Sequence, residues 1–431
     1  MLVHLKTLGC RLNEAELETW AKSFRKYGHG ITRQPENADL IVINSCAVTQ
    51  DAARKSRQLI RRIHRSNPEA KLVVSGCYAT LNQEEAEQLM GVDLVVGNPD
   101  KDQLVTKALT ELNMDAMPAM STEPGEVSLF SRGRQRAFVK VQDGCRYRCT
   151  FCIVTVARGI ERSRPIQDVI DEINSLHRQG IHEAIITGVH LGGYGSDTGE
   201  NLSNLIKAIL SETSIPRLRL GSLEPWELPE DFFELFDNPR LMPHLHLPLQ
   251  SGSDSVLRRM ARRCKTEEFS AIVERLRSNI PHFNITTDII VGFPGETEQE
   301  WRESFDYIER TGFGHIHIFT YSRREGTKAA TLAGQVNNEV KKQRSQQLQQ
   351  LAESMKREFF QANLGCEYQV LWEARTETGT DGKQLIFGYT PNYLRVACEL
   401  EPSCSLENRI TRTKLRGVLG DYLLAETVSA Q

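Results

Sequence analysis

The chain has 431 residues, of which 39% are hydrophobic and 25% are charged, so it can bury a sizeable core and should divide into two or three domains. A formal net charge of -3 excludes a uniformly basic body that binds nucleic acid by charge alone, and any RNA site must therefore be local. No apolar run approaches the roughly 18 residues that a membrane span needs, and no charged-then-apolar leader opens the chain, so we expect a soluble, cytoplasmic protein without a membrane partner.

Apolar runs alternate with longer amphipathic stretches from residue 1 to about residue 120. This alternation predicts a small domain with a doubly wound parallel sheet. The expected strands are Val3–Thr7, Leu40–Asn44, Leu72–Ser75 and Leu94–Val96, and the expected helices include Glu14–Tyr27 and Asp51–Ser66. The segment Asn113–Gly133 has no sustained periodicity and is rich in Met, Ser, Pro, Gly and Glu, which indicates a linker.

A second α/β domain is expected over residues 134–355, because about six strand and helix pairs follow one another there. Six units favour a partial (β/α)6 barrel over a complete eight-fold one. The expected strands are Ala137–Val141, Ala184–Thr187, Arg217–Gly221, His244–Leu247, Asn284–Val291 and His315–Thr320. The expected helices are Ile166–Gln179, Leu202–Glu212, Thr266–Ser278 and Glu298–Arg310.

The last part of the chain, residues 360–428, is expected to form a small all-β barrel. A charged helical stretch, Val340–Gln361, leads into it. The segments Glu367–Trp372, Gln384–Tyr389 and Leu394–Cys398 carry aromatic and β-branched residues between turn-forming residues.

Ten cysteines in a long chain without a leader indicate metal binding rather than a disulfide framework. Three of them, Cys145, Cys149 and Cys152, lie four and three residues apart just after a predicted strand. Three thiolates on one short loop can hold three irons of a cubane cluster and leave the fourth iron open for a ligand. The alternative is a zinc knuckle, but structural zinc usually takes four ligands in paired CxxC form.

The CxxxCxxC loop, with an aromatic residue before its last cysteine, resembles the signature of radical S-adenosylmethionine enzymes. The resemblance implies that the open iron binds S-adenosylmethionine and that an electron from the cluster cleaves it to a 5'-deoxyadenosyl radical. Two glycine-rich turns at predicted strand ends resemble the cofactor-contacting loops of these enzymes, with Gly188, Gly192 and Gly193 in one and Gly292 in the other. Glu224, at a third strand end, can bond a ribose or an amino group; ordinary βα turns and a helix cap are the alternatives.

Cys10, Cys46 and Cys77 each lie just past the carboxyl end of a predicted strand. Ligands bind at that edge of an open parallel sheet, so three residues far apart in sequence can converge on one site there. They can hold a second cubane cluster, whereas each cysteine alone would be read as a small buried hydrophobe. Cys264, Cys366, Cys398 and Cys404 show no such regularity, and we assign them no function.

The motifs around these three cysteines resemble the N-terminal domain of the methylthiotransferases, and the resemblance extends over essentially the whole chain. The further matching segments are Gln142–Cys145, Ala157–Gly159, Leu247–Ser253 and Asp288–Gly295. The resemblance implies two 4Fe-4S clusters and S-adenosylmethionine as cofactors, a methylthio group inserted at an unactivated C–H carbon, and a terminal TRAM domain. Thr155 departs from the proline usual in the family. Beyond the cluster ligands we single out no catalytic side chain.

The family divides by substrate into enzymes for isopentenyladenosine in tRNA, for threonylcarbamoyladenosine in tRNA, and for an aspartate of a ribosomal protein. The runs Lys6–Glu16, Ala157–Pro165 and Gly388–Val396 resemble the threonylcarbamoyladenosine branch. That likeness implies 2-methylthiolation of this nucleoside next to the anticodon. An electron donor and a sulfur donor are further partners that the sequence does not identify, and it does not specify the oligomeric state. A noncatalytic RNA-binding protein with a structural metal is the alternative of another class.

Local basic clusters agree with an RNA partner, since phosphate contacts give affinity without base specificity. One predicted helix carries Arg54, Lys55, Arg57, Arg61, Arg62 and Arg65, and another segment carries Arg258, Arg259, Arg262, Arg263 and Lys265. In the last domain, Tyr389 and Tyr393 are expected to be exposed and to stack on bases, beside a cluster of Arg395, Arg412, Lys414 and Arg416. A solvated helix face is the alternative for each charge run.

Overall fold

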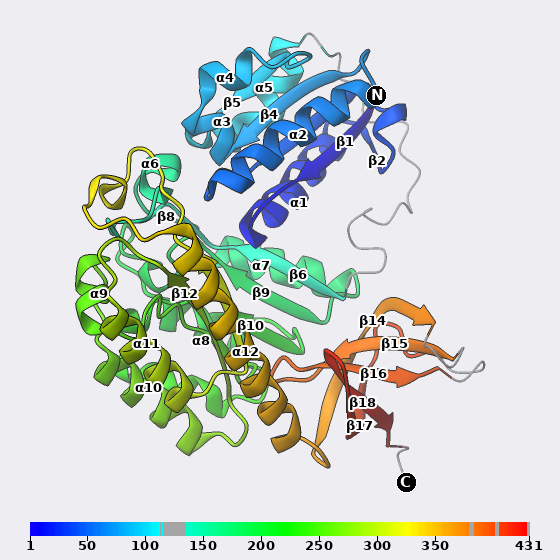
Figure 1. The fold of residues 1–431 in the computed structure, drawn as a ribbon. Coiled ribbons are helices and arrows are strands. Elements are labelled where there is room, and N and C mark those ends of the chain that lie inside the picture. The colour runs from blue at the N-terminus through cyan, green and yellow to red at the C-terminus, as the bar shows by residue number, and fades with distance from the viewer. Residues whose placement is uncertain (113, 115–134, 379–382, 401–404, 429–431) are drawn as a thin grey trace. The chain divides into compact units, whose positions relative to one another are not determined.

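The computed structural model describes residues 1–112, 114, 135–378, 383–400 and 405–428 (Figure 1). Nearly all of the predicted linker, and Cys404, lie outside the described residues. The chain forms two compact units. The N-terminal unit comprises residues 1–132, 142–162 and 322–330, and the barrel unit comprises residues 133–141, 163–321 and 331–431. Within the described residues, no helix is both long and apolar enough to cross a membrane.

A five-stranded parallel sheet forms the centre of the N-terminal unit, in the order β2-β1-β3-β4-β5. Its strands are β1 (Leu2–Thr7), β2 (Gly30–Thr32), β3 (Leu40–Ser45), β4 (Lys71–Gly76) and β5 (Leu94–Val96). Its helices are α1 (Arg11–Lys26), α2 (Gln50–Ser66), α3 (Cys77–Leu81), α4 (Gln83–Glu87) and α5 (Leu104–Glu111), with the 3-10 turns η1 (Pro35–Asn37) and η2 (Asn98–Gln103). Helix α1 begins three residues before its predicted start, directly after Cys10.

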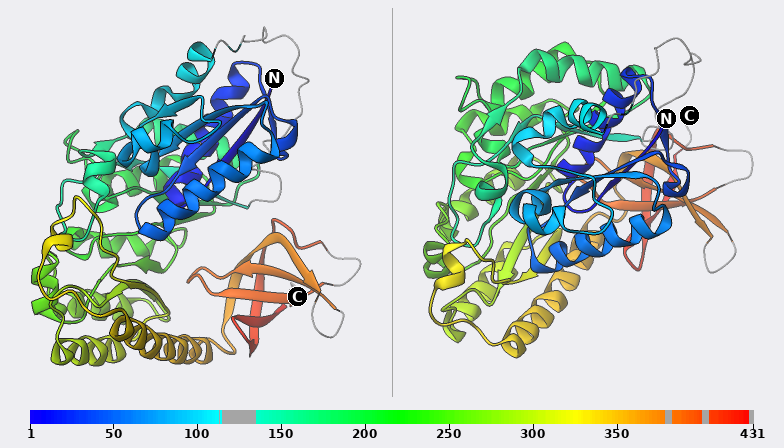
Figure 2. Two further views of the ribbon diagram at one scale, coloured as in Figure 1. Left: turned by 45° about the horizontal axis from the view of Figure 1, so that its top comes forward. Right: turned by 90° about the horizontal axis from the view of Figure 1, so that it is seen from above.

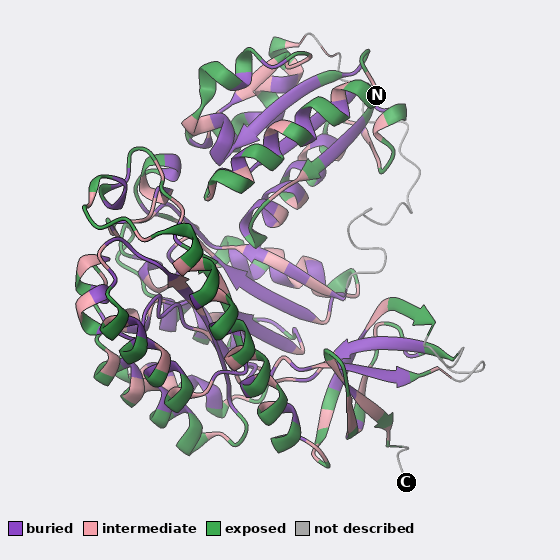
Figure 3. Ribbon diagram, in the orientation of Figure 1, coloured by how far each residue is buried: buried purple, intermediate pink, exposed green. Residues whose placement is uncertain are grey.

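Two hydrophobic clusters cover the two faces of this sheet. Its central strands are drawn mostly purple, the colour of buried residues, in Figure 3. Successive side chains of a strand point to opposite faces. Ile41 and Ile43 of β3 therefore pack with α2, while Leu40 and Val42 pack with α1 and α5. Helices on both faces of a parallel sheet confirm the predicted doubly wound architecture.

The segment that carries the CxxxCxxC loop belongs to the N-terminal unit rather than to the barrel unit. It holds β7 (Gln142–Asp143), the start of β8 (Arg162–Ser163) and the short helix α6 (Val154–Arg158). The segment 322–330 joins the same unit, where Ala329 N–H donates to the carbonyl of Thr150 at 2.8 Å. Both groups of sequence-predicted cysteine ligands therefore lie in one compact unit.

Six parallel strands form the partial barrel of the second unit, which confirms the predicted (β/α)6 architecture. They are β6 (Arg136–Lys140), β9 (Glu183–Thr187), β10 (Arg217–Leu220), β11 (His244–His246), β12 (Asn284–Val291) and β13 (His315–Thr320). The sheets β10-β9-β6 and β11-β12-β13 are joined by bridges at Leu218–Leu241 and Ser222–His246. The helices are α7 (Ile166–Arg178), α8 (Leu202–Glu212), α9 (Asp254–Arg259), α10 (Thr266–Asn279), α11 (Glu298–Thr311) and α12 (Asn338–Ala362), with the 3-10 turns η3 (Leu191–Gly193), η4 (Pro225–Glu227) and η5 (Glu230–Asp237). The turn η6 (Lys328–Thr331) begins in the segment 322–330 of the N-terminal unit.

A closed five-stranded barrel follows α12, and it is drawn from orange to red in Figure 2. Its strand order is β14-β15-β16-β18-β17. The strands are β14 (Glu367–Thr378), β15 (Gln384–Tyr389), β16 (Arg395–Glu399), β17 (Ile410–Leu419) and β18 (Tyr422–Thr427). This barrel confirms the predicted all-β end of the chain.

A buried carboxylate and three arginines connect the two barrels of this unit. Glu183 of β9 is 0% exposed and accepts hydrogen bonds from Arg219 at 2.9 and 3.2 Å. Arg217 donates to the carbonyl of Tyr389, and Arg136 donates to Glu373 at 2.6 Å. The first residues of the parallel strands thus hold the C-terminal barrel.

The structure corrects the expectation that Tyr389 and Tyr393 are exposed platforms for RNA bases. Both rings are half-buried and stack on each other with 5.0 Å between centroids. The guanidinium of Arg136 lies 4.2 Å from the Tyr389 ring centroid, and that of Arg219 lies 4.4 Å from the Tyr393 centroid. The sequence alone gave these rings no partner, because the arginines come from strands about 170 to 250 residues away.

We predict that Glu183→Gln destabilises the barrel unit by about 3–5 kcal/mol, because it leaves buried guanidinium groups without their carboxylate. Burial opposes ionisation of Glu183, but Arg219, Arg136 and Arg217 outweigh it and lower its pKa from 4.5 to about 2. The carboxylate therefore stabilises the fold fully above pH 4.5, and this contribution is lost as the pH falls toward 2. Chemical denaturation at pH 7 and pH 3 measures both effects.

Asp231→Asn is the matched control, because Asp231 forms an exposed ion pair with Lys207 at 2.9 Å. Loss of such a pair costs at most about 1 kcal/mol. Equal stability losses in the two variants would contradict the role assigned to Glu183.

Candidate metal centres

The register of the N-terminal sheet brings three cysteines to one edge. Thr7 of β1 lies opposite Asn44 of β3, and Ser45 lies opposite Gly76 of β4. Cys46 and Cys77 follow directly after these strand ends, and Cys10 caps the start of α1. All three cysteines thus lie at the carboxyl edge of the sheet, and they form one group, here called the N-terminal trio.

Two glycines allow the close approach of backbone at the N-terminal trio. Gly9 and Gly76 adopt φ values of 119° and 95°, a region that other residues rarely occupy. A Cβ atom on Gly9 would lie 2.9 Å from Sγ of Cys46, and one on Gly76 would lie 2.3 Å from the carbonyl oxygen of Ser45. Cys10 and Cys77 therefore approach β3 and Cys46 closely because the residue before each of them is a glycine.

Burial makes the N-terminal trio costly to ionise without a cation. Burial raises the pKa of the Cys46 thiol to about 11, and Arg158 opposes this rise. Desolvation also raises the pKa of Cys10, although part of its side chain stays accessible, and Arg158 is the largest opposing influence. Metal ions displace such protons and bind thiolates, and soft iron clusters suit this donor set.

A tightly held loop places Cys145, Cys149 and Cys152, here called the loop trio. Cys145 N–H donates to the carbonyl of Gly159 at 3.1 Å, and Cys152 N–H donates to that of Cys149 at 3.0 Å. Gly144 has φ of 73°, and a Cβ atom there would lie 1.9 Å from the carbonyl oxygen of Ile160. All three cysteines are partly accessible to solvent, as a cluster with an open iron requires.

Backbone donors and a hydroxyl support this loop. Val154 N–H donates to Sγ of Cys152 at 3.4 Å, which stabilises a thiolate. Thr155, the departure from the family's proline, donates its hydroxyl to the carbonyl of Tyr147 at 2.8 Å. The substitution therefore adds a hydrogen bond inside the loop.

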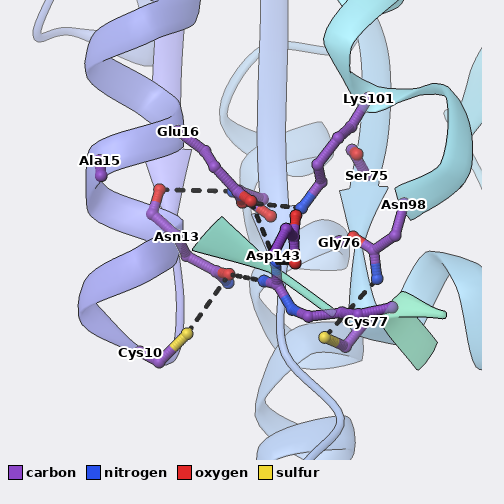
Figure 4. A network of polar contacts seen from close by, with 12 residues as sticks. Cys10, Asn13, Ala15, Glu16, Ser75, Gly76, Cys77, Asn98, Lys101 and Asp143 are labelled. Carbon is purple, nitrogen blue, oxygen red and sulfur yellow. Dashed lines mark hydrogen bonds and ion pairs between the residues drawn. The ribbon is translucent and has the colours of Figure 1, made fainter. Parts of the chain in front are cut away.

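A buried polar network lies beside the N-terminal trio, and Figure 4 shows it from close by. Glu16 of α1 is 4% exposed and accepts from Lys101 at 2.7 Å and from Asn44 at 2.9 Å. Its second oxygen accepts from Arg158 at 3.1 Å. Arg158 also donates to Asp143 at 3.0 Å and to Asn13 at 2.9 Å. Two carboxylates and two cations thus neutralise one another away from water.

The network reaches two of the three thiols through amide side chains. The Cys10 thiol donates to Oδ1 of Asn13 at 3.6 Å, and Nδ2 of Asn98 donates to Sγ of Cys77 at 3.7 Å. Nδ2 of Asn98 also donates to the carbonyl of Ala157 at 2.6 Å. One end of the network therefore contacts the N-terminal trio and the other contacts helix α6.

Sequence reasoning gave these network residues no role. Asn13, Asp143 and Arg158 lie within motifs that carry the family resemblance, so their presence there was the available signal. Glu16 ends the run Lys6–Glu16 and shares this signal, but its partner Lys101 had none, because only the fold brings two residues 85 positions apart within 2.7 Å.

The structure gives internal packing reasons for two of the predicted cofactor-contacting glycines. A Cβ atom on Gly192 would lie 2.5 Å from Cβ of Glu227, and one on Gly292 would lie 2.4 Å from Cγ of Lys341. Gly188 and Gly193 precede and end the turn η3, respectively. Glu224 accepts from Arg262 at 2.7 Å, so one of its oxygens already has a partner. Cofactor contact by these five residues remains a proposal.

A polar cluster that sequence reasoning missed lies on β11, β12 and β13. His246, Asp288 and His317 bring their ligand atoms within 4.8 Å of one another. Nε2 of His246 lies 3.3 Å from Asp288. Successive side chains of a strand point to opposite faces of the sheet. Ile289 and Ile316, the neighbours of Asp288 and His317, lie in the hydrophobic core, so the polar residues share the other face.

The two basic segments differ in how many of their arginine and lysine side chains form ion pairs with nearby carboxylates. In the segment 258–265, Arg259 pairs with Glu300 and Arg262 pairs with Glu224, both at 2.7–2.8 Å. On α2, Arg54 and Lys55 pair with Asp51. Arg57 pairs with Glu85, whereas Arg61, Arg62 and Arg65 are exposed on the same helix.

In the C-terminal barrel, Arg412 pairs with Glu367 and Arg416 with Glu426, and Arg395 lies 3.9 Å from Glu377.

Family models match both α/β parts of the chain. Residues 2–97 match the uncharacterized protein family UPF0004, and residues 139–308 match the radical SAM superfamily. The threonylcarbamoyladenosine tRNA methylthiotransferase MtaB of Thermotoga maritima is 37% identical over 91% of this chain and 90% of its own length. The MtaB of Bacillus subtilis is 35% identical over 91% and 89%. A tRNA-2-methylthio-N(6)-dimethylallyladenosine synthase of Wolbachia pipientis is 32% identical over 96% of each chain.

Solved structures share the fold at lower identity. The radical S-adenosylmethionine methyltransferase TsrM from Kitasatospora setae superposes with a TM-score of 0.58 and 17% identity, over 76% of this chain and 75% of that one. The cobalamin-dependent S-adenosylmethionine radical enzyme OxsB gives a TM-score of 0.52 and 14% identity, over 82% and 56%.

We predict that Gly76→Ala displaces Cys77 and lowers the iron bound by anaerobically reconstituted protein from about eight to about four atoms per chain. The added Cβ would strike backbone atoms of β3, which cannot move without breaking the sheet. Elemental analysis measures the iron.

Gly312→Ala is the control, because Gly312 also has a positive φ of 64° but no atom lies within 4 Å of its added Cβ. Full iron content in both variants would show that Gly76 does not position the N-terminal trio.

Proposed function

The chain belongs to the family of radical S-adenosylmethionine tRNA methylthiotransferases, and from this membership we propose that it adds a 2-methylthio group to N6-threonylcarbamoyladenosine next to the anticodon of tRNA. The relatives from Thermotoga maritima and Bacillus subtilis carry the name of this activity. The chain covers 90% and 89% of the lengths of these two relatives.

The cofactors are two 4Fe-4S clusters and S-adenosylmethionine. The observation that best supports their assignment is the convergence of two cysteine trios within one compact unit. We assign Cys10, Cys46 and Cys77 to one cluster and Cys145, Cys149 and Cys152 to the other. Cys145, Cys149 and Cys152 would hold the cluster that, when bound, supplies an electron to S-adenosylmethionine, and Cys10, Cys46 and Cys77 would hold the one that handles sulfur.

Two trios suit this reaction because the two tasks need different surroundings. The C2 carbon of an adenine base has no leaving group, so a radical must break its C–H bond while sulfur is kept ready nearby. The loop trio is partly exposed, so a small cofactor can reach it. Cys46 and Cys77 are 6% and 4% exposed, whereas Cys10 is exposed, so the N-terminal trio has two buried ligands and one that solvent reaches.

Exposed arginines of α2 support tRNA as the partner in this proposal. Arg61, Arg62 and Arg65 project from one exposed stretch of the helix, beyond the ion pairs of Asp51 and Glu85. Such side chains bind the phosphates of any sequence, and base recognition must come from the active site. An electron donor and a sulfur donor complete the proposed partners.

The substrate is tested by analysing tRNA nucleosides from a deletion strain by mass spectrometry. We expect 2-methylthio-threonylcarbamoyladenosine to disappear and its unmethylthiolated precursor to accumulate, while 2-methylthio-isopentenyladenosine stays at the parental level. The isopentenyl nucleoside is the necessary comparison, because the Wolbachia relative carries the name of the corresponding synthase. An unchanged threonylcarbamoyl product in a strain without a redundant enzyme would reject this substrate, and a loss of the isopentenyl product would assign the other one.

Separate tasks for the two trios give a second prediction. We expect Cys10→Ala to abolish methylthiolation but to retain formation of 5'-deoxyadenosine, because the loop trio keeps all three ligands. Anaerobic protein with dithionite, S-adenosylmethionine and tRNA provides both readouts by liquid chromatography.

Cys366→Ala is the matched control, since Cys366 lies in the barrel unit and has no assigned function. Equal loss of both activities in Cys10→Ala would contradict the division of tasks. A wild-type protein that releases no 5'-deoxyadenosine would favour a noncatalytic RNA-binding protein.

A further inference from the structure

Arg158 connects the two cysteine trios, and it has no role in the cluster chemistry proposed above. Its backbone lies at the end of α6, six residues after Cys152 of the loop trio. Its guanidinium is 3% exposed and is held by Asn13, Glu16 and Asp143 at 2.9–3.1 Å. The segment of the loop trio thus places a fixed positive charge beside Asn13, which contacts Cys10 of the N-terminal trio.

Three acceptors on two elements fix this guanidinium in place. Nη1 donates to both Glu16 and Asp143, and Nη2 donates to Asn13, whose Oδ1 also accepts from the Cys10 thiol. Asn98 adds a further restraint, because it bonds the carbonyl of Ala157 and the sulfur of Cys77. A planar guanidinium suits such a set of acceptors, whereas the ammonium of a lysine cannot span all three.

We propose that Arg158 is a positioning residue that raises the reduction potential of the cluster on the N-terminal trio. The inference rests on the proposed function, which supplies that cluster. Reduction adds one electron to a centre that already carries three thiolates. A fixed cation nearby stabilises the more negative state, and the net charge around a cluster is one of the factors that set its potential.

The carboxylates of the network do not cancel this effect at the sulfur atoms. Nη2 of Arg158 binds Asn13, the residue that contacts the Cys10 thiol, whereas the carboxylates of Glu16 and Asp143 bind Nη1. Arg158, Glu16, Asp143 and Lys101 are all at most 4% exposed, so salt and water screen them weakly. Removing Arg158 or Glu16 should therefore move the potential in opposite directions.

The experiment is a potentiometric titration followed by electron paramagnetic resonance. Full-length protein with Cys145, Cys149 and Cys152 replaced by alanine leaves one cluster to report. In this background we expect Arg158→Met to lower the midpoint potential by at least about 59 mV, which is a tenfold smaller reduced-to-oxidised ratio at a fixed solution potential. We expect Glu16→Gln to raise it, and Arg158→Lys to stay near the parental value because it keeps the charge.

A merely structural role would give a different pattern. General loosening would shift Arg158→Met and Glu16→Gln in the same direction, and Arg158→Lys would then behave like Arg158→Met. Either result, or an unchanged potential in Arg158→Met, would overturn the proposal. Where the triple-alanine protein binds no iron, the same variants are titrated in the two-cluster enzyme, in which S-adenosylmethionine perturbs only the signal of the loop trio.

The two proposals fail separately in this design. If the parental protein with an intact N-terminal trio binds no cluster there, the proposed function is wrong and the role of Arg158 falls with it. If the cluster is present and its midpoint potential does not change when Arg158 is replaced, only the present inference is wrong.

Discussion

A buried ion network fastens the cysteine-bearing segment 142–162 to the sheet of the N-terminal unit. Glu16, Asp143, Lys101 and Arg158 would each be costly to bury alone, and each is stabilised by the opposite charges of the others. Removing one member of such a network typically costs about 3–5 kcal/mol. These four buried charged residues are therefore stable only when the segment 142–162 lies against the sheet.

This constraint explains how a chain can bring two groups of ligands into one unit. The strand register places Cys46 and Cys77 side by side, and Gly9 and Gly76 make room for them. The loop trio comes from a separate part of the chain, where hydrogen bonds from Cys145 and Thr155 close the loop. The network joins the two, because its amide ends contact Cys10 and Cys77 while Arg158 belongs to the loop segment.

Local patterns predicted the architecture well, because strand and helix alternation and cysteine spacing are properties of short stretches. The doubly wound sheet, the six parallel strands and the closed C-terminal barrel are confirmed. Strand β2 was not predicted, since Gly30–Thr32 has one large apolar side chain, Ile31, and forms no apolar run. The error at Tyr389 and Tyr393 has a long-range cause: their arginine partners lie on β6 and β10. Sequence spacing likewise says nothing of the contact between Glu16 and Lys101. Six cysteine ligands were proposed from the sequence, whereas the residues that hold them in place required the fold.

The central claim is that six thiolates bind two iron clusters. Diffraction data collected at the iron absorption edge from anaerobically grown crystals test it most directly. The account predicts two anomalous peaks, one in bonding contact with the sulfurs of Cys10, Cys46 and Cys77 and the other with those of Cys145, Cys149 and Cys152. A single iron peak, or peaks that appear at the zinc edge instead, would contradict it.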